Sequence, residues 1–229
     1  SKWVGSWDED EGFFYDVLQL PGNKFVPLKI HSLVGLMPLY AVSLIEKESL
    51  VEIPDFMKRL KWFRKFRLRK KKFRAIEGFK EGEDILFSLV PKERVIKLVE
   101  HMIDEEEFLS PGGIRSLSKR HEERYSVSLE GEDYGIQYTP GESDSSLFGG
   151  NSNWRGPVWF PTNYLLLEAL REYYKHYGDE LTLEYPKGSR VQKNFKEIAN
   201  DISDRLMSIF QLDDKGNRPV NERHEFYQR

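Results

Sequence analysis

The sequence contains no cysteine, which excludes several classes of site. Without thiols the chain cannot form a disulfide scaffold, a thiolate nucleophile or a zinc site built on cysteine. Long hydrophobic runs are also missing, because Pro38 and Ser43 interrupt the longest apolar stretch, around residues 33–45. No membrane-spanning helix is therefore expected, and the first residues show no signal-peptide pattern. These absences favour a cytoplasmic chain.

The composition is that of an ordinary globular chain. Of 229 residues, 39% are hydrophobic, and 15 Phe, 11 Tyr and 5 Trp supply ample volume for a core. The length fits one domain or part of a larger one. Because the first residue is Ser1 and no leader precedes the first motif, we expect the chain to be a piece of something longer.

A strongly basic segment lies within a nearly neutral chain. Residues 58–74 hold 11 of the 35 Lys and Arg and no acidic residue, whereas the formal net charge is only −3. With its interleaved aromatic residues, the segment could bind nucleic acid or an anionic membrane. We favour an amphipathic helix instead, because Phe56, Leu60 and Phe63 have the spacing of one buried stripe.

The periodicity of the apolar residues predicts a mainly α fold. Helices are expected at 32–46, 54–66, 91–102, 162–177 and 195–209, with Thr162 or Asn163 capping the fourth. The first of them is apolar on nearly every face and is predicted to be buried from several sides. A short β-hairpin is expected within residues 12–30, because turn residues at 21–23 separate two apolar segments.

The segment 131–161 is the least helical and carries unusual chemistry. Its Gly-Gly and Gly-Pro pairs allow sharp turns that would present Trp154, Arg155 and Trp159 outward. Indole rings stack on sugar rings, and a guanidinium hydrogen-bonds their hydroxyl groups, so this set is typical of saccharide binding. The alternative, equally weighted on spacing alone, is that both tryptophans are core anchors and Arg155 is a buried ion-pair partner.

The titratable residues give weaker indications. The five histidines have no metal-ligand spacing, so no metal site is predicted, and His31 is expected to be a bonded core or cleft residue. The acidic run 104–107 is predicted to be an exposed helix end. Glu142 and Asp144 are weak candidates for a catalytic carboxylate pair, because most such loop pairs are only hydrogen-bond acceptors.

Four sequence blocks together resemble glycoside hydrolase family 63, in its microbial glucosidase-like branch. The blocks are WDEDEGFFYD at 7–16, HSLVGLMPLYA at 31–41, FLSPGGIRSLSKRH at 108–121 and NSNWRGPVWFPTNYLLLEAL at 151–170. The resemblance implies a partial (α/α)6 barrel and inverting hydrolysis of α-glucosidic bonds without a cofactor. Its substrate would be an α-glucoside or oligosaccharide. Inversion needs a carboxylic acid that protonates the leaving oxygen and, about 6.5–9.5 Å away, a carboxylate that activates water.

The resemblance also implies which residues form the walls of the sugar subsites. By motif these are Trp7, Asp8, Arg115, Trp154, Arg155 and Trp159. The family's general acid and base fall outside the blocks present here, so the catalytic residues are unknown. Residues 1–229 are therefore interpreted as the C-terminal part of a barrel, incomplete at both ends and inactive alone. Its first partner would be the remainder of that barrel.

A second function class stays open. In it the chain is a non-catalytic binding module that uses residues 58–74 to contact nucleic acid or an anionic membrane. The glycosidase interpretation expects neither of these partners. Salt-dependent binding to polyanions distinguishes the two.

Overall fold

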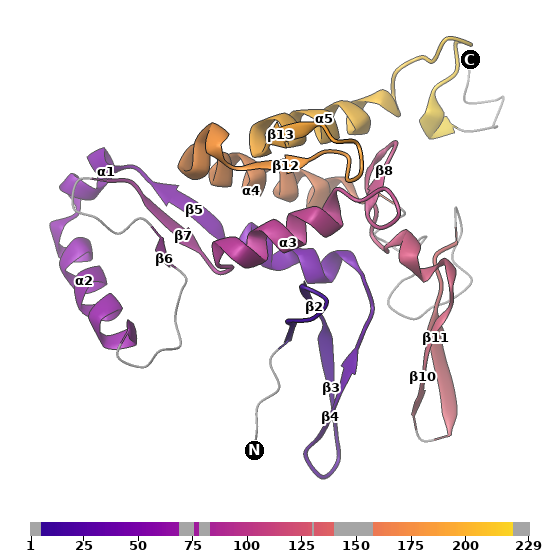
Figure 1. Ribbon diagram of the computed structural model, residues 1–229, viewed down its shortest axis with the longest axis horizontal. Helices are drawn as coiled ribbons and strands as arrows, with labels where there is room; N and C mark the ends of the chain where they lie inside the picture. The colour runs from indigo at the N-terminus through magenta and orange to yellow at the C-terminus, as the bar shows by residue number, and fades with distance from the viewer. Residues whose placement is uncertain (1–5, 69–75, 78–82, 130, 140–157, 222–229) are drawn as a thin grey trace.

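The computed structural model describes residues 6–68, 76–77, 83–129, 131–139 and 158–221, in which helices alternate with small antiparallel sheets (Figure 1). The helices are α1 (Lys47–Glu52), α2 (Pro54–Leu68), α3 (Lys92–Met102), α4 (Phe160–Tyr177) and α5 (Phe195–Ser208), with 3-10 turns η1 (Leu33–Tyr40), η2 (Lys119–Glu122), η4 (Gly178–Glu180) and η5 (Pro219–Asn221). None of the helices described is long and apolar enough to cross a membrane.

The strands pair as short hairpins and one three-stranded sheet. The pairs are β1 (Trp7–Asp8) with β2 (Phe13–Phe14), β3 (Asp16–Leu20) with β4 (Lys24–Leu28), β8 (Leu109–Ser110) with β9 (Gly113–Ile114), β10 (Tyr125–Leu129) with β11 (Glu132–Ile136) and β12 (Thr182–Glu184) with β13 (Gln192–Asn194). The sheet has the order β5 (Val42–Ile45), β7 (Ile85–Ser88), β6 (Ile76–Glu77). The fold is thus mixed rather than mainly α, and the described residues show no barrel.

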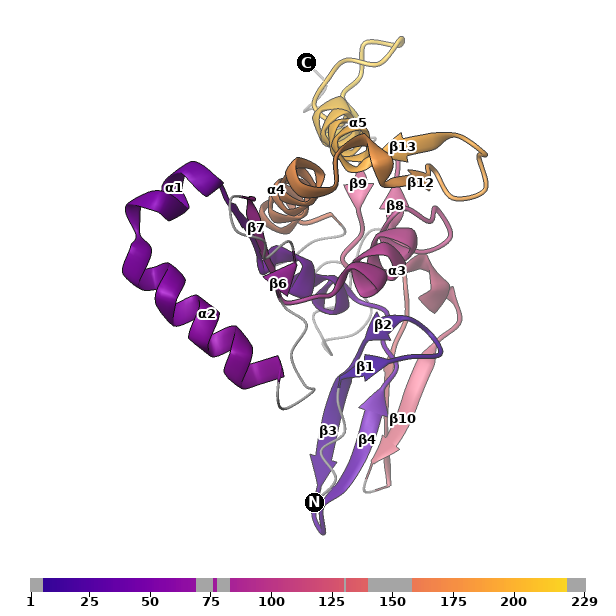
Figure 2. The ribbon, with the colours of Figure 1, turned by 60° about the vertical axis from the view of Figure 1, so that its left-hand side comes forward.

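The main core lies where α3, α4, α5 and η1 meet. Three predicted helices supply it: α3 buries Val95, Leu98, Val99 and Met102, α4 buries Leu166, Leu170 and Tyr173, and α5 buries Phe195, Ile198, Ile202 and Leu206. Both views show α4 and α5 side by side, with α3 crossing beneath them (Figures 1 and 2). The 3.6-residue spacing of these stripes predicted each helix correctly.

The predicted N-terminal hairpin is confirmed as β3 and β4. Asp16 pairs with Leu28 and Leu20 with Lys24, and the connecting turn uses left-handed backbone at Gly22 and Asn23. A second hairpin, β10–β11, lies beside it (Figure 2), and apolar side chains of both line a shared pocket. Because β11 lies within 131–161, that segment is less irregular than predicted.

The helix predicted at 32–46 is wrong in type. Leu33–Tyr40 forms the 3-10 turn η1, and Val42–Ile45 then pairs with β7 as strand β5. The burial of the first half is correct, since Leu33, Leu36 and Leu39 are buried. An apolar run without clear periodicity does not distinguish a buried helix from a strand, and here partner strands decide the outcome.

The basic helix α2 forms as predicted, but its expected buried stripe does not. Leu60 is buried, with Leu50 and Ile85 as neighbours, whereas Phe56 is 39% exposed and Phe63 is half-buried. Helices α1 and α2 stand apart from the other helices in both views (Figures 1 and 2). We call residues 47–68 the basic arm. The prediction for Phe56 is wrong because little of the chain described covers this face.

Candidate functional site

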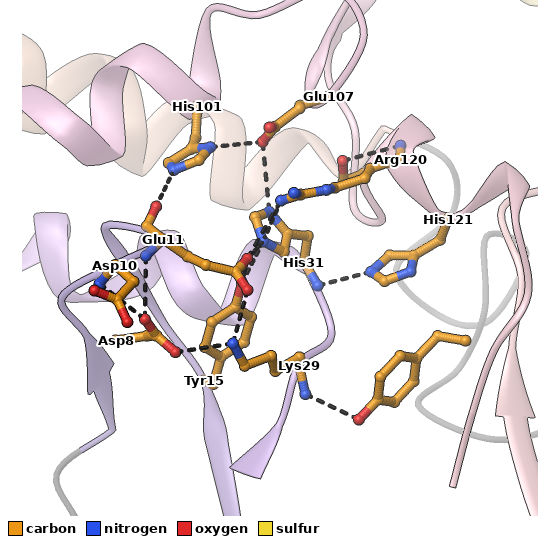
Figure 3. A network of polar contacts seen from close by, with 12 residues as sticks. Asp8, Asp10, Glu11, Tyr15, Lys29, His31, His101, Glu107, Arg120 and His121 are labelled. Carbon is orange, nitrogen blue, oxygen red and sulfur yellow. Dashed lines mark hydrogen bonds and ion pairs between the residues drawn. The ribbon is translucent and has the colours of Figure 1, made fainter.

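A polar network around the buried His31 joins four segments that lie far apart in the sequence (Figure 3). It contains the turn after β1 with Glu11, the loop before η1 with His31, the end of α3 with His101 and the following turn with Glu107. η2 adds Arg120 and His121 to its edge. Glu11, His31 and the two η2 residues fall in the sequence blocks singled out above, whereas His101 and Glu107 do not.

His101 and His31 face the same carboxylate oxygen. His101 Nδ1 lies 2.7 Å from Glu107 Oε2, and His31 Nδ1 lies 3.4 Å from the same oxygen. The other ring nitrogen of His101, Nε2, lies 2.9 Å from the backbone carbonyl of Glu11. Burial lowers the pKa of His101, but the hydrogen bond and charge of Glu107 outweigh it and raise that pKa above 6.5.

Glu107 itself is strongly biased toward its ionised form. Burial raises the pKa of its carboxyl group, but the hydrogen bond with His101 and the close charges of His101 and His31 reverse this and hold the pKa far below 4.5. The side chain is only 12% exposed, so the prediction of an exposed acidic helix end is wrong for Glu107. The rest of that run is more open, since Glu105 and Glu106 are exposed.

Glu11 holds the other side of the network together. Its carboxylate accepts hydrogen bonds from Lys29 Nζ at 2.8 Å and Tyr15 Oη at 2.7 Å. Burial raises the pKa of Glu11, but these bonds and one from His31 together lower it to about 2. His31 is buried and hydrogen-bonded as predicted, and Tyr15 also contacts its Nε2.

His121 closes the network on the side of η2. It accepts a hydrogen bond at Nε2 from the backbone N–H of His31, at 2.8 Å. Burial lowers the pKa of His121 to about 4, and the charges of His31 and Arg120 act in the same direction. His121 is therefore neutral at neutral pH, as an acceptor at Nε2 must be.

The predicted site residues Trp7 and Asp8 lie at the start of this network. Asp8 accepts backbone hydrogen bonds from Asp10 at 3.0 Å and Glu11 at 3.1 Å, and pairs with Lys29 at 3.1 Å. Trp7 is half-buried, with its ring edge-on against Phe14. The carboxylate of Asp8 thus shapes its own turn.

Arg115 is joined to the segment that carries the tryptophan motif. Its backbone forms an antiparallel bridge with Val158, which directly follows Pro157 of that motif. Its Nη1 donates to the backbone carbonyls of Leu109, Glu105 at 3.1 Å and Glu107 at 3.3 Å. The guanidinium therefore ties together the loop in which it stands.

Asn163 clamps the start of α4 to this loop. Its side chain accepts from the N–H of Ile114 at 2.7 Å and donates to the carbonyl of Ile114 at 3.0 Å. Gly113 makes the close approach possible, because a Cβ there would lie 2.8 Å from Leu206 and its φ is +122°. The predicted cap is wrong: Trp159 is the N-cap of α4, and neither Thr162 nor Asn163 takes that position.

The other predicted site residues divide into two groups. Trp159 is half-buried at the start of α4, two residues beyond Pro157. Trp154, Arg155, Glu142 and Asp144 lie outside the residues that the structure describes. Sequence reasoning missed Glu107, His101 and Asn163 as members of the site. Asn163 lies in a motif block and Glu107 directly precedes one, and these positions are the only signals that could have identified the two residues. No comparable signal marks His101.

Comparison with known proteins shows the family. The model of the mannosylglycerate hydrolase MGH1-like glycoside hydrolase domain matches residues 56–209. The uncharacterized protein YMR196W of Saccharomyces cerevisiae is 42% identical over 218 residues, which cover 94% of this chain and 20% of that protein. Mannosyl-oligosaccharide glucosidase of the same yeast is 27% identical over 145 residues, which cover 62% of this chain and 14% of that protein.

These matches also show that the chain is much shorter than its relatives. It spans a fifth or less of the length of the curated relatives it matches. The match to the family model covers more than half of the chain and includes Arg115, Asn163 and Glu107. The chain belongs to the MGH1-like glycoside hydrolase domain family, and it is distantly similar to a family 63 glucosidase.

Proposed function

We propose that the protein carrying this chain is an inverting α-glucosidase, and that this chain forms part of the wall of its sugar-binding cleft. The antiparallel bridge between Arg115 and Val158 is the observation that carries the proposal. It puts the SPGGIRS loop directly beside the segment that leads from the tryptophan motif into α4. Two of the four sequence blocks thus lie together at one helix end, where a sugar ring could meet both.

The helices support an (α/α)6 barrel as the architecture of the whole domain. Consecutive helices α4 and α5 pack against each other across a buried apolar seam, as the paired helices of such a barrel do. The described helices are too few for two full rings. We therefore propose that the remainder of the barrel comes from the rest of the protein.

Among the described carboxyl groups, the two whose pKa values are lowered most do not fit the role of general acid. An inverting glycosidase needs one carboxyl group with a raised pKa to protonate the leaving oxygen and one ionised carboxylate to activate water. Glu11 and Glu107 have lowered pKa values and hydrogen-bond protein groups. We propose that the acid and the base lie elsewhere in the protein, with Glu142 and Asp144 as the weaker alternative.

Each wall residue has a distinct role in this proposal. Trp154 and Trp159 would offer indole faces for stacking on the apolar face of a glucose ring, and Arg155 hydrogen bonds to hydroxyl groups. Trp7 and Asp8 would take part from the rim, because Arg94 lies over the Trp7 ring and Asp8 is bonded to its own turn and to Lys29. Arg115 would mainly stabilise the loop that carries it, because its Nη1 donates hydrogen bonds to backbone carbonyls of that loop. No cofactor takes part in this chemistry.

The proposal is tested by the products of the whole protein. Proton NMR of fresh reaction mixtures with α-linked glucose disaccharides is expected to show β-glucose first, because inversion converts an α bond into a β product. Trp154→Ala and Arg155→Ala should lower kcat/KM by ~100-fold or more, as expected for loss of contacts that orient the substrate. Trp62→Ala, on the basic arm, is the matched control and should leave activity unchanged.

A specific observation favours a second function for the basic arm. Trp62 is 66% exposed and stacks on Phe66, with ring centroids 5.5 Å apart, on a helix that also carries Lys58, Arg59 and Lys65. Exposed aromatic rings on a basic helix are typical of a helix lying on an anionic membrane. Co-sedimentation with phosphatidylserine vesicles should decrease with salt and with Trp62→Ala. Equal binding to neutral vesicles would contradict this second function.

A further inference from the structure

The strongest unassigned feature is the set of three ligand-type atoms at the centre of the polar network. One ligand-type atom each of His31, His101 and Glu107 lies within 4.8 Å of the other two, and both histidines approach Glu107 Oε2 through Nδ1 (Figure 3). They come from the loop before η1, the last turn of α3 and the turn that follows it. His31 is only 2% exposed, so the group is held away from bulk water.

One of these atoms, a ring nitrogen of His31, lacks a hydrogen-bond partner. His31 Nδ1 is buried without a hydrogen-bond partner, since Glu107 Oε2 at 3.4 Å is an ion-pair contact. A buried polar atom without a partner is rare and calls for an explanation such as an ion. The nitrogen points toward the same oxygen as His101 Nδ1, so a single ion between them would satisfy all three groups.

The other ring nitrogens are already oriented as in metal sites. His101 Nε2 faces the carbonyl oxygen of Glu11 at 2.9 Å, and His31 Nε2 faces the carboxylate of Glu11 at 3.3 Å. A metal-bound histidine usually donates its second N–H to a carbonyl or carboxylate, which fixes the ring. Glu11 supplies both acceptors here.

From this geometry we propose that His31, His101 and Glu107 bind a divalent transition-metal ion, with Zn²⁺ as the best fit. Two imidazole nitrogens and one carboxylate oxygen are a common donor set for Zn²⁺, which leaves a fourth position for water. Bond lengths of about 2.0–2.1 Å imply ligand atoms about 3.3 Å apart. The 3.4 Å distance from His31 Nδ1 to Glu107 Oε2 agrees with this separation. His101 Nδ1, which lies 2.7 Å from the same oxygen, would have to move away from it by about half an ångström.

Arg120 is the group that opposes the ion. Its Nη1 lies 3.0 Å from His31 Nε2 and can donate an N–H there only while Nε2 carries no proton. A metal ion bound at Nδ1 would instead put the proton on Nε2, facing Arg120. The Arg120 side chain is 51% exposed and has Glu11 Oε2 at 3.4 Å as another partner. It is therefore free to turn toward Glu11 when the ion enters.

The ion would link three elements of the fold. The loop before η1, the end of α3 and the turn with Glu107 would share one centre, beside the carbonyls that hold Arg115. We assign the ion a structural role. Its effect is on stability, and the test below does not require activity.

Binding is tested on the full chain with Co²⁺ and Zn²⁺. Titration with Co²⁺ should give visible absorption bands at one equivalent, and Zn²⁺ should displace them and raise the thermal midpoint. Glu107→Gln and His101→Gln should each weaken binding more than about tenfold. Glu106→Gln is the matched control, because Glu106 is next to Glu107 in the sequence but its side chain is 80% exposed. This variant should bind the ion as the parent does.

Arg120→Gln provides a readout that does not depend on damaging the fold. Removing the opposing cation should strengthen Zn²⁺ binding several-fold. Circular dichroism of each metal-free variant separates loss of binding from loss of folding. The proposal is overturned if the folded parent chain binds no Co²⁺ stoichiometrically, or if Glu107→Gln and Glu106→Gln bind alike.

Discussion

Helices α3 and α2 were both predicted from an apolar stripe, but their environments differ. The stripe of α3 is fully buried at Val95, Leu98 and Val99, whereas in the stripe of α2 Leu60 is buried and Phe56 is 39% exposed. α3 is enclosed by η1 and β2, while α2 meets a small cluster formed with Leu50 and Ile85. Periodicity thus predicts that a helix forms, but it does not predict how deeply the apolar face is buried. Burial depends on packing partners from distant parts of the chain.

The difference also separates two kinds of function. The core around α3, α4 and α5 holds the loops of the proposed sugar-binding wall in place through Asn163 and the polar network. The basic arm is set apart from that core (Figure 1), and its exposed aromatic residues are suited to contact a partner. Substitutions in the two regions should therefore have different consequences.

The largest effect is expected from Leu98→Ala in α3. Leu98 is completely buried, so the substitution leaves a cavity and should lower the free energy of unfolding by about 2 to 5 kcal/mol. Phe56→Ala on the basic arm removes a larger side chain that is 39% exposed, and should cost about 1 kcal/mol or less. Urea denaturation measures both. Equal losses would remove the distinction between core and arm.

Asn163→Ala is expected to destabilise the core by about 2 to 3 kcal/mol. The change leaves the N–H and C=O of Ile114 buried without partners, and this costs more than the bonds themselves contribute. Asn163→Asp should recover the bond from the N–H but not the one to the carbonyl. Urea denaturation would contradict the clamp if Asn163→Ala were as stable as the parent.

A smaller, pH-dependent effect is expected at Asp201 of α5. Burial raises the pKa of Asp201, but hydrogen bonds from Tyr185, Arg205 and Lys193 outweigh it and lower that pKa below 3.8. The resulting stability is present above pH 3.8 and is lost as the pH falls through the lowered value. Asp201→Asn should cost about 1 kcal/mol at pH 7 and less at pH 3.

Denaturation at the two pH values measures that difference. The matched control is Asp204→Asn, at an exposed position of the same helix, and it should cost less stability at pH 7 than Asp201→Asn. If both variants lost stability equally at pH 7, the partners around Asp201 would contribute nothing specific.

The smallest change in stability is expected for Trp62→Ala. Because the ring is 66% exposed, the free energy of unfolding should change by about 0.5 kcal/mol or less. The same substitution should weaken binding to anionic vesicles. A large loss of stability would mean that the arm packs on a surface beyond the residues described.

Local patterns predicted much of the fold, and long-range pairing accounts for the errors. The turn at Gly22 and Asn23 and the stripes of α3, α4 and α5 are local signals, and each prediction is confirmed. Strand β5 was missed because Val42–Ile45 becomes a strand only by pairing with β7, some 40 residues later. Short strands of this kind carry little periodicity of their own.

The site was less predictable than the fold for the same reason. His31, His101 and Glu107 have no ligand spacing in the sequence, because three separate segments bring them together. Glu107 stands in an acidic run in which Glu105 and Glu106 are exposed, so composition favoured a solvated role. The placement of Arg115 beside Val158 likewise depends on a backbone bridge between distant segments.

The most direct test of the account is a fluorescence titration of the whole protein with α-glucosides. The account predicts saturable tryptophan quenching that is kept in Trp62→Ala on the basic arm and strongly reduced in Trp159→Ala at the start of α4. Quenching that disappears with Trp62→Ala and persists with Trp159→Ala would contradict a sugar-binding wall beside α4, as would a parent protein that no α-glucoside quenches.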